Sequence, residues 1–139
     1  MPPTLLIDTN VLLDWLVFRD PRVARLAQAV TAGAVRWIVS QPMLDELEHV
    51  LTRDEIVLWK PDQHAIAEVL TRLPVRVDGV ATPAQPLLRC ADPDDQKFLD
   101  LALHERAQGL ISRDKALLRL ARKAQPLGLR IVTPECSYG

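Results

Sequence analysis

Short apolar runs alternate with segments of helical spacing along the chain, and this alternation narrows the possible folds more than any other feature. The runs show no polar alternation, and turn or capping residues follow them. Strands of this kind are buried on both faces, as in parallel sheets covered by helices. The pattern therefore predicts an α/β fold with a mainly parallel sheet. The expected strands are residues 5–8, 37–40, 75–77, 110–112 and 129–132.

Apolar residues three and four positions apart predict helices between these strands. The first helix follows Asp8, and the others are expected at residues 21–32, 42–52, 61–73, 92–107 and 115–123. Residues 79–93 contain three prolines and no clear period, so we expect a loop there, and loops of this length tend to be functional or mobile. Trp15, Trp37 and Trp59 are expected in the core.

Size and composition favour one domain that spans residues 1–139. The chain is 48% apolar and 25% charged, which suits a single hydrophobic core and excludes low complexity and disorder. Cys90 and Cys136 show neither a metal-ligand spacing nor a disulfide framework, which favours a reducing compartment. No signal-peptide pattern and no membrane-spanning run is present in the sequence, so we expect a cytoplasmic protein.

The net charge of −1 hides an asymmetry along the chain. Residues 1–95 carry nine basic and fourteen acidic side chains, whereas residues 96–139 carry eight basic and four acidic ones. A polyanion could bind the basic part, although the same cations could simply solvate helix faces. Total charge does not decide between these interpretations.

Two aspartates end apolar runs in the same way. Asp8 ends the first expected strand, and Asp114 follows the strand at residues 110–112. Ligands bind at the carboxyl edge of open parallel sheets, so the two side chains should face one crevice if their strands are neighbours. Aspartate is also common at strand-to-helix turns as a helix cap, so either residue alone has a structural explanation.

Further acids come from the starts of two helices. Asp95 precedes Phe98 and Leu99 by three and four residues, which places it on the helix face that packs on the sheet. Asp92 could either cap this helix or join the other acids at the carboxyl edge of the sheet. On the helix at residues 42–52, Glu46 and Glu48 flank the apolar stripe about equally, and the position of Glu46 nearer the amino end favours it weakly.

Asp8, Glu46, Asp95 and Asp114 would repel one another if they met without a counter-ion. Two like charges 4 Å apart repel by about 4 kcal/mol at an effective dielectric constant near 20. A hard divalent cation removes this repulsion, and all-oxygen ligands favour Mg²⁺ or Mn²⁺ over zinc. Clustering of these acids would therefore indicate a metal site.

Four motifs in this order resemble the PIN-domain family, specifically the toxin components of type II toxin-antitoxin systems. They are Leu-Ile-Asp-Thr-Asn-Val-Leu at residues 6–12, Ser-Gln-Pro-Met-Leu-Asp-Glu-Leu-Glu-His-Val-Leu at 40–51, Asp-Pro-Asp-Asp-Gln-Lys-Phe-Leu at 92–99 and Ser-Arg-Asp-Lys-Ala-Leu-Leu at 112–118. The resemblance implies an α/β/α sandwich around a mainly parallel sheet of four to five strands.

The resemblance also implies Mg²⁺-dependent or Mn²⁺-dependent hydrolysis of RNA, with catalytic acids at Asp8, Glu46, Asp95 and Asp114. Asp8, Asp95 and Asp114 would hold the cation, Glu46 would bind it directly or through water, and Asp92 matches an extra acid of one branch of the family. Asn10 and Ser112 would orient a ligand or water. Lys97, Arg113 and Lys115 flank the acids and are candidates for contacts to RNA phosphates. A cognate antitoxin protein is the implied partner, and the oligomeric state, monomer or homodimer, stays open.

Three other interpretations remain. A housekeeping RNA-processing nuclease would carry the same acids without an antitoxin. An acyl-phosphate protein, of the phosphatase or receiver type, also places an aspartate at a strand end, but phosphatases of that type have a second aspartate where this chain has Asn10. A module that only binds a partner would not need the acids.

Overall fold

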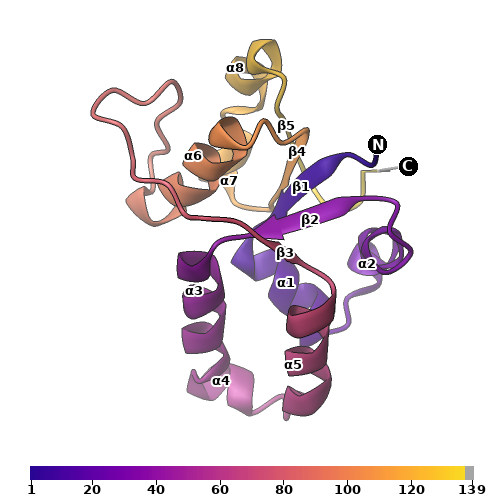
Figure 1. Cartoon of the computed structure of the whole chain (residues 1–139). Coiled ribbons are helices and arrows are strands. Elements are labelled where there is room, and N and C mark those ends of the chain that lie inside the picture. Colours follow the sequence, from indigo (N-terminus) through magenta and orange to yellow (C-terminus); the bar gives the residue numbers. More distant parts are fainter. Residues whose placement is uncertain (137–139) are drawn as a thin grey trace.

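The computed structural model describes residues 1–136, and within them the chain forms a five-stranded sheet with helices on both faces (Figure 1). The strands are β1 (Thr4–Ile7), β2 (Arg36–Val39), β3 (Val75–Arg76), β4 (Gly109–Ile111) and β5 (Arg130–Val132). They are ordered β3-β2-β1-β4-β5, and every pairing is parallel. This architecture confirms the predicted α/β class.

The register brings the carboxyl ends of β1 and β4 to the same level. Leu5 pairs with Gly109 and Ile7 with Ile111. One residue further on, the backbone N–H of Asp8 donates to the carbonyl oxygen of Ile111 at 2.9 Å. The segments that follow β1 and β4 therefore start side by side at the edge of the sheet where ligands bind in open parallel sheets.

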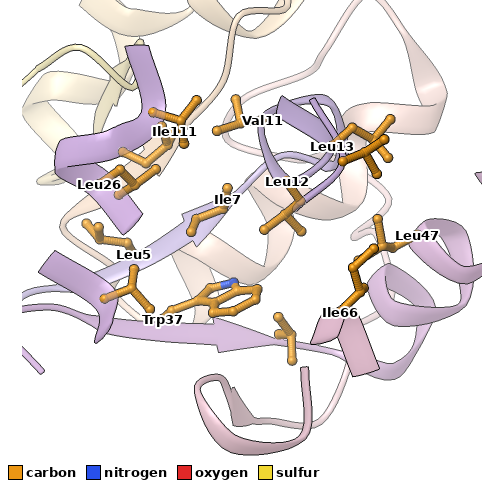
Figure 2. Packing of buried hydrophobic residues seen from close by; sticks show 14 of the residues in the cluster. Leu5, Ile7, Val11, Leu12, Leu13, Leu26, Trp37, Leu47, Ile66 and Ile111 are labelled. Atoms are coloured by element: carbon orange, nitrogen blue, oxygen red, sulfur yellow. The ribbon is translucent and has the colours of Figure 1, made fainter. Parts of the chain in front are cut away.

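The two faces of the sheet build two apolar cores because successive side chains of a strand point to opposite faces. Leu5 and Ile7 pack with α1 (Thr9–Leu16), α2 (Ala24–Thr31), α3 (Gln41–Leu51) and α5 (Gln63–Arg72), as Figure 2 shows. Leu6 packs on the other face with α6 (Gln96–His104), α7 (Lys115–Leu118) and α8 (Ala121–Ala124). The sheet thus forms the middle layer of three.

The tryptophans follow the prediction only in part. Trp37 is fully buried, and the partly buried Trp15 packs against it with ring centroids 5.6 Å apart. The expectation for Trp59 was wrong, because its side chain is 61% exposed. Trp59 follows α4 (Asp54–Val57), a short helix that the periodicity did not predict, and makes an edge contact with Phe18.

Local backbone geometry sets helix ends that the apolar pattern misplaced. The helix expected to run to residue 107 ends at His104, because Arg106 adopts a positive φ of 52° and closes the turn. Its expected start at residue 92 is a 3₁₀ turn, η2 (Pro93–Asp95), and α6 begins after it. The helix expected at residues 115–123 is divided into α7 and α8.

The remaining short elements connect these layers. A 3₁₀ turn, η1 (Pro21–Val23), precedes α2, and another, η3 (Gln125–Leu127), precedes β5. The long loop between β3 and η2 projects from the sheet in Figure 1, in agreement with the predicted loop. None of the helices in residues 1–136 combines the length and apolar character needed to cross a bilayer.

Candidate metal centre

Three aspartates that lie far apart in the sequence converge at the carboxyl edge of the sheet. Asp8 follows β1, Asp114 follows β4, and Asp95 ends η2 just before α6. One carboxylate oxygen from each of the three lies within 4.8 Å of the others. We call Asp8, Asp95 and Asp114 the aspartate cluster.

Local backbone structure fixes the position of each of these aspartates. Asp8 has extended backbone angles and occupies the cap position of α1. Asp114 caps α7, with its Oδ1 accepting from the backbone N–H of Ala116 at 2.8 Å. Asp95 sits where the 3₁₀ turn passes into α6, on the buried side of the helix. The cluster is therefore held by two strand ends and one helix start.

Ser112 links two members of the aspartate cluster. Its fully buried hydroxyl donates to Oδ2 of Asp8 at 2.7 Å and accepts from the backbone N–H of Asp114 at 2.9 Å. The hydroxyl thereby bridges the carboxylate of Asp8 and the backbone of Asp114. The structure places Ser112 directly behind the carboxylates, where a residue that orients them should lie.

Burial and mutual repulsion perturb the charges of the cluster. Burial raises the pKa of Asp8, and the hydrogen bond from Ser112 partly opposes this rise. The pKa of Asp95 is raised, first by burial, then by its hydrogen bond to Asp114 and by the charge of Asp8. That same hydrogen bond lowers the pKa of Asp114. Asp95 is therefore the member of the cluster that most readily keeps its proton, and Asp114 readily stays ionised.

The geometry of Asp95 fits a cation site. Its Oδ2 is buried and has no hydrogen-bond partner among residues 1–136. A buried carboxylate oxygen without a partner is costly, and a cation shared with Asp8 and Asp114 would satisfy it. Because all three ligands are carboxylate oxygens, the donor set suits a hard ion such as Mg²⁺ or Mn²⁺.

Glu46 borders the aspartate cluster without belonging to it. Its side chain is 30% exposed, and its charge raises the pKa of Asp8. Oε2 accepts from the hydroxyl of Thr9 at 2.5 Å, and Oε1 accepts from Nζ of Lys97 at 3.2 Å. Glu48, the alternative on the same helix, instead lines a hollow between α3 and α5. Sequence reasoning missed the contact of Thr9 with Glu46.

Asp92 and Asn10 lie further out. Asp92 is exposed, and its Oδ1 accepts from the backbone N–H of Asp94 at 3.0 Å, although its charge still raises the pKa of Asp95. Asn10 is exposed in the first turn of α1. Their parts in metal or ligand binding stay predictions.

The three cations expected to contact RNA differ in their surroundings. Lys97 reaches Glu46 and also donates to the carbonyl oxygen of Asp94 at 2.5 Å. Lys115 is exposed at the start of α7. Arg113 is enclosed by carboxylates, with nitrogen-to-oxygen distances of 3.4 Å to Asp14, 3.7 Å to Asp20 and 3.2 Å to Glu135. Contact of RNA with Arg113 would have to compete with these ion pairs.

A buried polar network beside the cluster was also missed. Gln96 follows Asp95 directly, and its side chain bonds to the backbone of Leu88 and Cys90 and to Asp100. Asp100 in turn accepts from the hydroxyl of Thr82. Polar residues at positions 96 and 100, one helical turn apart among apolar neighbours, were the signal that could have revealed this network.

Comparison with known proteins adds to this geometry. A family model described as PIN domain matches residues 4–116, a span that contains the aspartate cluster and Glu46. No curated protein matches the chain.

Proposed function

The chain belongs to the PIN domain family, and from this premise we propose that it is a metal-dependent endoribonuclease acting on single-stranded RNA. Domains of this family are generally nucleases, so nuclease chemistry follows from membership. The RNA substrate and the choice of Mg²⁺ or Mn²⁺ are the finer part of the proposal.

The observation that carries the proposal is the orphaned Oδ2 of Asp95 inside the aspartate cluster. Hydrogen bonds account for a carboxylate oxygen of Asp8 and of Asp114, but not for this buried oxygen. A purely structural role for Asp95 would leave an unsatisfied buried acid beside two others. Binding of a divalent cation supplies the missing partner and offsets the repulsion between the three carboxylates.

Hydrolysis needs a water oxygen to form a bond to phosphorus while the bond from phosphorus to the leaving ribose oxygen breaks. When bound, a divalent cation lowers the pKa of water and neutralises charge that develops on the phosphoryl oxygens. Asp8 and Asp114 supply negative charge to hold it, and Asp95 releases its proton as it binds. Ser112 holds the carboxylate of Asp8 against the backbone of Asp114.

Glu46 and Lys97 border the space in which the phosphodiester would lie. The hydroxyl of Thr9 fixes one oxygen of Glu46 and leaves the other to the ammonium group of Lys97. In this position Glu46 can ligate through water, while Lys97 can exchange Glu46 for a phosphate oxygen. Lys115, exposed after Asp114, offers a further cation to the backbone of the RNA.

The cleavage test uses a labelled single-stranded RNA with Mn²⁺ or Mg²⁺. The wild-type protein should cleave it, and chelation of the metal should stop cleavage. Asp114→Asn should reduce the rate at least a hundredfold, whereas Asp45→Asn, an exposed carboxylate on α3, should leave it unchanged. Equal rates for the wild type and Asp114→Asn would refute the proposal.

We extend the proposal to the toxin of a toxin-antitoxin pair, supported by the four motifs that resemble such toxins. Expression of the chain in a bacterial host should arrest growth, and Asp114→Asn should not. Co-expression of the protein encoded by a neighbouring small gene should restore growth. Normal growth at high levels of the active protein would favour the housekeeping nuclease instead.

A further inference from the structure

The loop between β3 and η2 is fastened to α6 by the buried polar network described above. Oε1 of Gln96 accepts from the backbone N–H of Cys90 at 2.7 Å, and its Nε2 donates to the carbonyl oxygen of Leu88 at 2.8 Å. The hydroxyl of Thr82 donates to Asp100 at 2.6 Å, and Gln96 and Asp100 are each less than 10% exposed. We call residues 82–91 the strap, since hydrogen bonds to the buried side chains of Gln96 and Asp100 hold both ends of it.

A hollow of about 540 Å³ lies between the strap and the start of α6. Its lining consists of Thr82, Arg89, Cys90, Ala91, Pro93 and Gln96. This volume lies within the range of small-ligand sites. The walls combine the cation Arg89, the polar residues Thr82 and Gln96 and the apolar residues Ala91 and Pro93, a mixture that suits a phosphate, a sugar and a base.

The lining of the hollow is next in sequence to two acids of the site. Ala91 and Pro93 flank Asp92, and Gln96 follows Asp95 directly. Burial raises the pKa of the Cys90 thiol, and the charges of Asp95, Asp114 and Asp92 raise it further, which places this wall of the hollow near two members of the cluster. An RNA strand with one phosphate at the cluster would then have a neighbouring nucleotide near the hollow.

Arg89 is the cation of the hollow. It is exposed, and no ion pair joins it to a carboxylate within residues 1–136. In contrast, Arg113 is enclosed by three carboxylates and Lys97 is bound to Glu46. Arg89 is thus free to bind an anion, and a guanidinium group suits the geometry of a phosphate.

We propose that the hollow between the strap and α6 is a subsite for the nucleotide next to the cleaved phosphodiester of single-stranded RNA, with Arg89 bound to its phosphate. This inference rests on the proposed function. Gln96 and Asp100 act as positioning residues, because they hold the strap that carries Arg89. The subsite gives a reason for two buried polar side chains, Gln96 and Asp100, to hold a surface loop in place.

The test measures binding of a labelled single-stranded RNA by fluorescence anisotropy in EDTA, where no cleavage occurs. Arg89→Ala should weaken binding by roughly tenfold. It should also make the dependence of log K on log salt less steep by about 0.7, the value for one lost phosphate contact on a single strand. Arg53→Ala, an exposed arginine between α3 and α4, is the matched control and should bind like the wild type.

Gln96→Leu should weaken binding about as much as Arg89→Ala, and the double variant should be no weaker than either. Near-ultraviolet circular dichroism checks that Gln96→Leu is folded. If Gln96→Leu does not fold, Thr82→Val takes its place, because it removes the hydrogen bond at the other end of the strap. Wild-type binding by Arg89→Ala, or equal weakening by Arg53→Ala, would overturn the subsite.

Cleavage separates this inference from the proposed function. If the wild type cleaves RNA with Mn²⁺ and Arg89→Ala raises KM while leaving kcat within about twofold, both stand. If the wild type cleaves and Arg89→Ala changes neither binding nor KM, the subsite alone is wrong. If the wild type neither binds nor cleaves RNA, both are wrong.

Discussion

At the scale of single residues, the hydroxyl of Ser112 lies between Asp8 and the backbone of Asp114. It is fully buried and makes one hydrogen bond as donor and one as acceptor. The resemblance to the PIN-domain family implied a residue that orients a ligand or water. The structure shows a more specific contact, because the hydroxyl joins the carboxylate of Asp8 to the backbone of Asp114.

Ser112→Ala should therefore affect both stability and activity. Loss of the hydroxyl leaves a buried oxygen of Asp8 and the N–H of Asp114 without partners, which costs about 1–3 kcal/mol of unfolding free energy. Metal affinity or activity should fall by roughly 10-fold to 100-fold. Urea unfolding and Mn²⁺ titration measure the two effects. Thr71→Ala, which removes an exposed helix hydroxyl, is the control, and unchanged metal affinity in Ser112→Ala would contradict the orienting role.

Asp95 gives the metal-free protein a distinctive pH dependence. Because its pKa is higher in the folded than in the unfolded state, the folded protein binds more protons above about pH 4, and stability should fall as pH rises toward neutrality. The raised pKa of Asp8 also makes stability fall as pH rises. The lowered pKa of Asp114 has the opposite effect, since it makes stability fall as pH drops below about 4.

The matched comparison is the wild type against Asp95→Asn in EDTA, by urea unfolding at about pH 5 and about pH 8. The variant should be more stable than the wild type at the higher pH by about 1–2 kcal/mol, with the advantage shrinking at the lower pH. An advantage that grows toward low pH, or none at either pH, would show that Asp95 is not destabilised by its neighbours.

At the scale of elements, the adjacency of β1 and β4 creates the site. The apolar runs predicted both strands, and the aspartates that end them predicted a common edge. The sequence could not reveal the strand order, because pairing depends on contacts between segments more than one hundred residues apart. For the same reason it could not show that the pKa of Asp95 is raised and that of Asp114 lowered, since both shifts depend on the contact of α6 with β4.

The junction of α1, α3 and α6 adds a prediction about Glu46. Thr9→Val keeps the shape of the side chain but removes the donor to Oε2 of Glu46, so the carboxylate should move toward Lys97. Activity should fall by roughly tenfold, with a stability loss of about 1 kcal/mol or less. Steady-state cleavage and thermal unfolding measure these effects. If Glu46→Gln inactivates the protein but Thr9→Val does not, the hydroxyl has no positioning role.

At the scale of the whole molecule, two apolar cores share one sheet. Leu5 and Ile7 belong to one core and Leu6 to the other, so neither face can lose its packing without disturbing the same strand. The binary pattern predicted this buried sheet. It failed for Trp59, because an apolar residue in a short helix carries no periodic signal that tells burial from exposure.

We propose on this basis that the chain unfolds as one domain. Differential scanning calorimetry should show a single transition with equal calorimetric and van't Hoff enthalpies. Mn²⁺ should raise the midpoint in the wild type and not in Asp8→Asn, since only the folded state assembles the aspartate cluster. Two separable transitions would contradict a single cooperative unit.

The central claim is that Asp8, Asp95 and Asp114 form one cation site, and calorimetric titration with Mn²⁺ tests it most directly. The wild type should bind Mn²⁺ with release of protons, Asp95→Asn should bind at least tenfold more weakly, and Asp94→Asn, which alters the exposed neighbouring carboxylate, should bind like the wild type. Equal Mn²⁺ binding by the wild type and Asp95→Asn, or no binding by either, would contradict the account.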